Sequence, residues 1–457
     1  MAYYLAVDIG ASSGRHILGQ IVDGKLVLEE VYRFENGMDK VDGSLIWDTE
    51  RLLSEIVNGL KKCGELGKIP QTMSIDTWGV DYALLDKDGV LIEPVVAYRD
   101  DRTLEIMDEV ESIIPVEELY SRTGIQRQSY NTIYQLYCDK KSGKLDKAAR
   151  ILLTPEYLAY CLTGQAKNEY TIASTTGLLN SKSRTWDTEI LDRLGIKKDI
   201  FGELNMPTTK VGNLKPEICK EVGFDLDVVF CPAHDTASAV AACPMGDDGM
   251  YISSGTWSLV GVELDNPITD SIASEKGFSN EGGINHRYRF LKNIMGMWLF
   301  QNIRKNLNKK YSYDEMMKMA EASEFTRTVD VNAQEFTAPE SMIEAIRAKL
   351  GEPELPIGDV LNCVYHSLAT LYSNTADEIE QIVGKKINQI HIVGGGGADK
   401  YLNRLTSKIS GRAVFTGLKE ATAVGNLIGQ IMYCDKSMDL AACRKLVSAS
   451  FSVSQAK

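Results

Sequence analysis

Two short segments of the chain combine small residues, hydroxyl groups and a turn in a pattern that suits phosphate binding. They are residues 8–15, with the sequence DIGASSGR, and residues 253–258, with the sequence SSGTWS. Small side chains let backbone N–H groups approach an anion closely, and the hydroxyl groups are further donors. A carboxylate directly before such a loop, here Asp8, can hold a metal-bound water beside phosphates. Either segment alone is more often a plain hairpin turn, but two of them, each after an apolar run, favour a phosphate site.

A candidate acid–base residue lies near the middle of the chain. Asp235 follows the apolar run 228–231 and opens the helical pattern 236–243. An aspartate at a helix N-terminus stays ionised and can accept the proton of a hydroxyl that attacks phosphorus. The alternative is that Asp235 only caps the helix, which is what most aspartates in this position do.

Two further segments suit flat or hydroxylated ligands. Residues 394–397 are four consecutive glycines between a predicted strand and a predicted helix. Such a run costs backbone entropy, so it indicates either a flat ligand such as adenine or ribose, or tight strand–helix packing. The G-x-x-x-x-G-K-[ST] pattern is absent, and the run is not a G-x-G-x-x-G fingerprint. In residues 74–82, Trp78 beside Gly79 suits a sugar face, with Asp76 or Asp81 bonding hydroxyls; a buried turn is the equal alternative.

The elements predicted from hydrophobic periodicity place these segments at strand ends. Residues 3–9, 15–22 and 25–34 read as a meander that turns at Asp23-Gly24, and residues 73–76 and 82–85 as strands. Helices are predicted at 49–63 and over most of 100–200, with stops at Gly124, Gly164 and Gly195. Near the C-terminus the pattern predicts strand, helix, strand and a last helix at residues 390–393, 398–410, 413–416 and 420–433.

An interruption at residues 244–249 divides this pattern into two halves that open alike, each with a strand, a turn rich in Gly, Ser and Thr, and a second strand. The sequence therefore predicts an α/β protein of two domains, residues 1–245 and 246–457, with a cleft between them.

Composition excludes several classes of protein. The 457 residues are 44% hydrophobic and 25% charged, which is typical of globular rather than disordered chains. A formal net charge of -13 disfavours broad binding to nucleic acid or to anionic membranes. The nine cysteines include no C-x-x-C pair, which argues against zinc knuckles. The N-terminus lacks the basic region of a signal peptide, and no stretch approaches the roughly 20 apolar residues of a membrane helix, so we expect a soluble cytoplasmic protein.

Set in order along the chain, these segments resemble the FGGY carbohydrate kinases. The matching pieces are residues 8–15, 74–81, 234–240, 253–258 and 391–396. Their details, with those of residues 97–100 and 291–296, are similar to the branch that acts on L-rhamnulose.

This resemblance implies two ribonuclease-H-like domains of the actin and hexokinase kind, and a Mg²⁺-dependent transfer of the γ-phosphoryl group of ATP to position 1 of L-rhamnulose, in rhamnose catabolism. The alternatives are a kinase for a similar deoxyketose such as L-fuculose, and an actin-like ATPase without phosphoryl transfer.

The resemblance also implies roles for individual residues. The general base is Asp235, and the sugar contacts are Gly79, His234, Asp235, Thr236 and Asn293. The ATP contacts are Ala11, Ser12, Ser13, Gly14, Arg15, Thr256, Gln301 and Gly395, and Asp8 holds Mg²⁺ through water. Asp399 and Lys400 depart from the family, many members of which carry amide side chains there. The expected partner is a small sugar, without nucleic acid or membrane, and no oligomeric state is predicted.

Overall fold

The computed structural model describes residues 2–456 and divides the chain into two compact units. Unit 1 contains the chain up to Ala242, then Glu263–Phe290 and Ala421–Ser450. Unit 2 contains Cys243–Val262, Leu291–Glu420 and the chain from Phe451 onward. Each unit is thus assembled from separate segments, whereas the sequence pattern predicts one division between residues 245 and 246.

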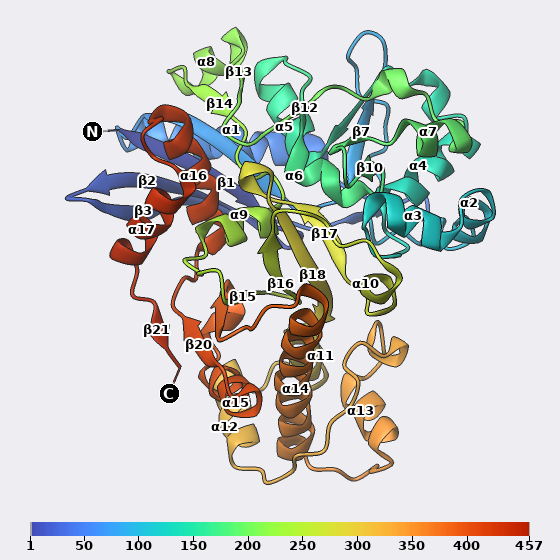
Figure 1. The fold of residues 1–457 in the computed structure, drawn as a ribbon. Coiled ribbons are helices and arrows are strands. Elements are labelled where there is room, and N and C mark those ends of the chain that lie inside the picture. Colours follow the sequence, from blue (N-terminus) through green and yellow to red (C-terminus); the bar gives the residue numbers. More distant parts are fainter. Residues whose placement is uncertain (1, 457) are drawn as a thin grey trace. The chain divides into compact units, whose positions relative to one another are not determined.

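A six-stranded sheet, in the order β13-β14-β6-β1-β2-β3, lies at the centre of unit 1 (Figure 1). β1 pairs antiparallel with β2 and parallel with β6, so the chain leaves β1 and β6 at the same edge of the sheet. The β2–β3 hairpin turns at Asp23 and Gly24, whose φ angles of 50° and 71° are those of a tight two-residue hairpin turn. In chain order the elements of unit 1 are β1 (Tyr3–Ile9), β2 (Ser13–Val22), β3 (Lys25–Glu35), β4 (Asp39–Val41), β5 (Ser44–Ile46), α1 (Thr49–Glu65), β6 (Pro70–Thr77), β7 (Tyr82–Leu85), α2 (Met107–Ile113), α3 (Val116–Thr123), α4 (Thr132–Lys141), β8 (Arg150–Leu153), α5 (Thr154–Thr163), β9 (Asn168–Glu169), α6 (Tyr170–Ala173), β10 (Leu179–Asn180), β11 (Thr185–Trp186), α7 (Thr188–Leu194), β12 (Leu204–Asn205), β13 (Lys210–Asn213), α8 (Pro216–Val222), β14 (Asp227–Val229), α9 (Asp235–Ala242), α10 (Ser271–Glu275), β17 (Ser279–Gly282), α16 (Ala421–Cys434) and α17 (Leu440–Ser450).

Helix α16 returns from the C-terminal part of the chain to the sheet of unit 1. The Gln430 side chain donates a hydrogen bond from Nε2 to the backbone oxygen of Leu5 on β1 (2.9 Å). α16 also packs closely on α9, because a Cβ atom on Gly425 would come within 1.7 Å of the backbone oxygen of Ser238. Only glycine permits that approach, so α16 and α9 form one layer against β1 and β6.

Unit 2 is built around strands in the order β18-β16-β15-β19-β20-β21. β15 pairs antiparallel with β16 and parallel with β19, which repeats the arrangement of β1 with β2 and β6. The 27-residue helix α14 packs against α12 and α15. The elements, two of which begin or end in unit 1, are β15 (Gly249–Ser254), β16 (Trp257–Leu264), β18 (Tyr288–Met295), α11 (Trp298–Asn306), α12 (Tyr313–Glu321), α13 (Met342–Leu350), α14 (Ile357–Val383), β19 (Gln389–Val393), α15 (Lys400–Ser410), β20 (Ala413–Thr416) and β21 (Ser454–Gln455).

Local sequence signals predict many of these elements correctly. The predicted helix 49–63 lies within α1, and Gly124, Gly164 and Gly195 end α3, α5 and α7 in the left-handed conformation. The prediction of a last helix at 420–433 is wrong in one respect, because α17 follows α16. α17 buries Cys443, Leu446 and Val447, so its apolar face is short. Within residues 2–456, no helix is long and apolar enough to cross a membrane.

Candidate active site

The turn between β1 and β2 carries the first predicted phosphate loop. Gly10 N donates to Ser13 O (2.9 Å), and the Asn36 side chain donates to Gly10 O (2.8 Å), which closes the turn. Ser12 is exposed, and Ala11 and Ser13 are half-buried. Gly14 is buried, and a Cβ atom there would lie 2.1 Å from the Phe34 ring. Packing therefore accounts for Gly14, whereas the residues before it are accessible to a ligand.

Asp8 and Arg15 are registered partners across the same hairpin. Arg15 donates from Nε and Nη2 to Asp8 Oδ2, at 3.0 and 2.7 Å. The predicted metal-holding carboxylate and one predicted ATP contact therefore bind each other, and the guanidinium group orients the carboxylate.

A second carboxylate, Asp76, lies beside Asp8 because the two are registered neighbours on β1 and β6. Asp76 is 0% exposed; its Oδ2 accepts from Asn426 Nδ2 (2.6 Å), and its Oδ1 has no hydrogen-bond partner among the described residues. Burial, reinforced by the charge of Asp8, raises the pKa of Asp76 well above its usual value. The sequence pattern suggests Asp76 as a sugar ligand or as part of a buried turn. Its register with Asp8 depends on strand pairing, for which the chain carries no local signal.

Asp235 is the first residue of α9, and its hydrogen bonds engage one oxygen. Thr236 donates to Asp235 Oδ1 from its backbone N (2.6 Å) and from Oγ1 (3.2 Å), and His234 Nε2 lies 3.2 Å from the same atom. A capping aspartate would instead accept from the second or third N–H of the helix. The Asp235 side chain is 34% exposed, so the group is both held and accessible, as proton transfer requires.

The loop after β6 lies beside this residue. Thr77 N donates to Ala233 O (3.0 Å), and Thr77 forms a parallel bridge with His234. Gly79 allows close packing, because a Cβ atom there would lie 3.0 Å from Thr175 Oγ1. Unit 1 thus brings together the predicted residues Asp8, Ala11–Arg15, Gly79 and His234–Thr236 at one edge of its sheet.

Asp81 does not have the sugar-binding role that the sequence suggested for it. It is 1% exposed, and its Oδ2 accepts from Trp47 Nε1 (2.7 Å), Trp78 Nε1 (2.9 Å) and Tyr98 N (3.1 Å). Burial raises its pKa to about 6, against the effect of these donors. Asp81 therefore holds the loop from inside, and it turns the N–H of Trp78 inward.

Unit 2 contains the second predicted phosphate loop. Gly296 N and Trp298 N donate to Thr256 O at 3.2 and 3.1 Å, which joins the loop to the start of α11. Gln301 lies exposed on that helix, and Asn293 lies half-buried on β18 just before it. Thr256 and Gln301 thus belong to one local structure.

The glycine run lies against this second loop, and its members have different roles. Ser253 and Val393 are registered partners on β15 and β19. A Cβ atom on Gly394 would lie 2.9 Å from Ser254 O, and one on Gly396 would lie 1.9 Å from Ser254 Oγ. A Cβ atom on Gly395 would meet nothing within 4 Å. Packing thus accounts for Gly394 and Gly396, whereas Gly395 borders open space, and a ligand contact there stays a prediction.

A cavity of 340 Å³ in unit 2 begins at this run. Lys400, Arg404 and Lys419 line it, together with Asn403, whose Oδ1 is buried without a hydrogen-bond partner among the described residues. Basic side chains and an unsatisfied acceptor suit a nucleotide. Arg404, Asn403 and Lys419 come from α15 and the segment after β20, and no sequence motif singles them out.

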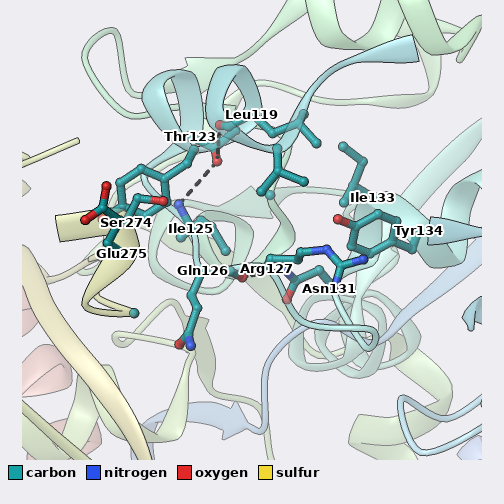
Figure 2. Close-up of a pocket in the computed structure, with 14 residues that line it drawn as sticks. Leu119, Thr123, Ile125, Gln126, Arg127, Asn131, Ile133, Tyr134, Ser274 and Glu275 are labelled. Carbon is teal, nitrogen blue, oxygen red and sulfur yellow. Dashed lines mark hydrogen bonds between the residues drawn. The ribbon is translucent and has the colours of Figure 1, made fainter. Parts of the chain in front are cut away.

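A different cavity, of 280 Å³, lies in unit 1 between α3 and the start of α4 (Figure 2). Apolar groups such as Leu119 and Ile133 line it with Gln126 and Arg127, and Arg127 is paired with Glu111 at 2.5 Å. Its lining includes no predicted site residue within the described chain, so it is separate from the candidate active site.

Comparison with known families identifies the class of protein. The sequence model of the FGGY family of carbohydrate kinases, N-terminal domain, matches residues 3–242, and that of the C-terminal domain matches residues 250–434. The chain therefore belongs to the FGGY family of carbohydrate kinases and is a sugar kinase, a phosphotransferase whose co-substrate is ATP. The predicted family and enzyme class are confirmed.

Within this family, the chain is most informatively compared with two curated relatives. The chain is 45% identical over 460 residues to the rhamnulokinase of Halalkalibacterium halodurans, covering 99% of this chain and 98% of that one. It is 41% identical over 459 residues to the rhamnulokinase of Bacillus subtilis, covering 98% and 94%.

Solved structures show the same fold at low identity. The xylulose kinase from Lactobacillus acidophilus aligns with a TM-score of 0.82 at 18% identity, covering 99% of this chain and 93% of that one. The Plasmodium falciparum glycerol kinase with ADP aligns with a TM-score of 0.80 at 14% identity, covering 100% and 94%. The predicted two-domain α/β fold of the actin and hexokinase kind is confirmed.

Proposed function

We propose that this sugar kinase phosphorylates L-rhamnulose at position 1. The observation that carries this substrate is the identity of 39–45% over nearly the whole chain to proteins named rhamnulokinase. The motif versions at residues 74–81 and 291–296, where the predicted sugar contacts Gly79 and Asn293 lie, agree with it.

In the proposed reaction Asp235 is the general base. The sugar hydroxyl oxygen forms a bond to the γ-phosphorus of ATP while the bond from that phosphorus to the β–γ bridging oxygen breaks, and ADP leaves. The hydroxyl proton moves to the Asp235 carboxylate. The hydrogen bonds that occupy Oδ1 and the exposure of the side chain support this role, because they leave Oδ2 to accept the proton.

ATP would use groups from each unit. The accessible turn at Ala11–Ser13 and the Thr256 loop suit the phosphates, and the 340 Å³ cavity that Gly394 and Gly397 line suits the adenosine. Backbone amides in such loops hold phosphate oxygens without bringing further negative charge close to them.

Mg²⁺ would be held through water at Asp8. Among residues 2–456 no cluster of three or more His, Cys, Asp or Glu residues is arranged to hold a metal directly. Mg²⁺ usually keeps several waters and binds one or two carboxylates together with substrate phosphates, so Asp8 fits such an ion. When bound, Mg²⁺ neutralises charge on the β- and γ-phosphates.

We expect Asp8→Asn to raise the Mg²⁺ concentration needed for half-maximal turnover, because a neutral amide holds a hydrated metal ion less well than a carboxylate does. An unchanged Mg²⁺ titration would contradict the assignment.

A panel of ketoses tests the substrate. Purified protein is supplied with ATP, Mg²⁺ and one sugar at a time, including L-rhamnulose, L-fuculose, L-ribulose and D-xylulose, and ADP release and the position of the new phosphate are measured. We expect the highest kcat/KM with L-rhamnulose and a 1-phosphate product. A higher kcat/KM with L-fuculose would replace the proposed substrate, and ADP release without sugar phosphate would contradict the transfer itself.

A further inference from the structure

Behind His234 lies a buried group of charges that the proposed reaction does not use. Arg289, which is 0% exposed, and Glu281 on β17 form an ion pair in unit 1, with Arg289 Nη2 and Glu281 Oε2 2.9 Å apart. Burial acts to raise the pKa of Glu281, but Arg289 and His234 together outweigh it, and the pKa is lowered to about 2. Both side chains reach the same atom of His234: Nη2 lies 3.0 Å and Oε2 3.2 Å from Nδ1.

The alignment of these two contacts indicates which imidazole nitrogen carries the proton. The contact of Arg289 Nη2 with Nδ1 has hydrogen-bond geometry, whereas Glu281 Oε2 has no aligned hydrogen bond within the described residues. A guanidinium group can only donate, so Nδ1 must accept. The proton of the neutral ring is then on Nε2, the nitrogen 3.2 Å from Asp235 Oδ1.

We propose that Arg289 is a positioning residue that holds His234 as the Nε2-protonated tautomer, so that the protonated Nε2 faces Asp235 Oδ1 at 3.2 Å and leaves Oδ2 for the sugar hydroxyl. Glu281 balances the buried charge of Arg289. The positive end of an N–H group beside a carboxylate favours the ionised form of that carboxylate, which is the form a general base needs. The proposal rests on the role of Asp235 given above.

Two substitutions, one on each side of this ion pair, separate positioning of His234 from simple stabilisation. In Arg289→Lys the shorter side chain ends in a compact ammonium group, which cannot donate to Nδ1 as the forked guanidinium group does. The ring proton of His234 then moves from Nε2 to Nδ1, and Nδ1 donates it to Glu281. Asp235 then loses the N–H group that faces its Oδ1, so the acidic limb of kcat/KM moves to higher pH. We expect kcat to fall at least about tenfold, less than on loss of a general base. In Glu281→Gln, Arg289 still donates to Nδ1, so the tautomer and the acidic limb stay in place. Both variants should melt earlier than the native enzyme.

Other titratable groups also face Asp235, and the two variants leave them unchanged. They are Asp76 on β6 and Tyr98 in the segment after β7, in addition to His234 itself. A difference between the two variants therefore reports on the His234 ring rather than on these neighbours.

The tautomer is read directly by ¹⁵N NMR of the full-length protein labelled at its five histidines, with His234→Gln to assign the His234 signals. We expect an Nε2–H ring in the native protein and in Glu281→Gln, and an Nδ1–H ring in Arg289→Lys. An Nδ1–H ring in the native protein overturns the proposal even if Arg289→Lys fails to fold. The same tautomer and the same pH profile in both variants overturn it as well. Because the spectra need no substrate, they decide the role of Arg289 independently of the ketose panel.

Discussion

Three carboxylates of unit 1, Asp8, Asp76 and Asp235, lie at one edge of its sheet, and their surroundings suit them to different tasks. Asp8 is paired with Arg15, which orients its carboxylate. Asp76 is buried, and its raised pKa favours the protonated form. Asp235 alone of the three combines donors on one oxygen with an exposure of 34%. A general base must be ionised and within reach of its substrate, so Asp235 fits that task best.

We predict that Asp235→Asn lowers kcat by at least ~10²-fold, the low end for loss of a general base, with little change in ATP binding or thermal midpoint. The amide oxygen can still accept from Thr236, so the start of α9 should keep its geometry. Steady-state kinetics, ATP titration and thermal unfolding check this. Asp48→Asn is the control, because Asp48 caps α1 by accepting from Arg51 N (2.9 Å), and asparagine caps equally well. Near-native turnover in Asp235→Asn would remove the base assignment.

The glycine run gives a second residue-level prediction. In Gly395→Ala the new methyl group meets open space in the protein, so it should raise the KM for ATP several-fold and leave the thermal midpoint nearly unchanged. In Gly396→Ala the methyl group would lie 1.9 Å from Ser254 Oγ, so it should destabilise the fold by about 1–3 kcal/mol. Thermal unfolding and ATP kinetics of both variants are the measurements. Early melting with normal ATP kinetics in Gly395→Ala would assign that glycine to the scaffold.

At the scale of elements, α16 connects the late part of the chain to the edge of the sheet where the proposed catalytic residues lie. Asn426 donates to Asp76 Oδ2 (2.6 Å) and to Ser74 O (3.2 Å) on β6. α9, which begins with Asp235, packs on the same helix at Gly425. The placement of Asp235 and Asp76 thus depends on one helix packing against its neighbours.

We predict that Gly425→Ala destabilises unit 1 and also lowers kcat. The methyl group would lie 1.7 Å from Ser238 O, which is backbone, so α9 and α16 must separate at a cost of about 1–3 kcal/mol or more. Urea unfolding gives the stability change, and kcat below the unfolding transition gives the effect on the site. Gly64→Ala in α1 is the matched control: the nearest atom to its Cβ is 3.4 Å away, and alanine favours a helix. Equal stability of the two variants would contradict the close packing of α9 and α16.

At the scale of the whole molecule, the proposed ligand contacts are divided between the two units. Asp235, Gly79 and the first phosphate loop belong to unit 1, and the second loop and the 340 Å³ cavity belong to unit 2. If one ATP molecule uses both sets of contacts, binding gains energy from bringing the units together. Closure of this kind excludes water, which could otherwise accept the phosphoryl group.

We therefore predict a smaller radius of gyration when both a sugar and a non-hydrolysable ATP analogue are bound. Small-angle X-ray scattering of the free protein, of each single-ligand mixture and of the ternary mixture is the measurement. The single-ligand samples separate the effect of one site from that of both. Superimposable curves at saturating concentrations of both ligands would exclude closure.

The sequence by itself determined what depends on residues close together in the chain. Turn chemistry at Asp23-Gly24, glycine helix stops and motif order were sufficient to predict many elements, the family and the two-domain fold. Only the tertiary structure decided the contacts between distant residues. Asn426 and Asp76 are 350 positions apart, and Arg289 and His234 are 55 apart. Periodicity and turn propensity arise from residues that are neighbours in the sequence. The burial of a carboxylate and the tautomer of a histidine depend instead on the distant residues that pack against them in the folded protein.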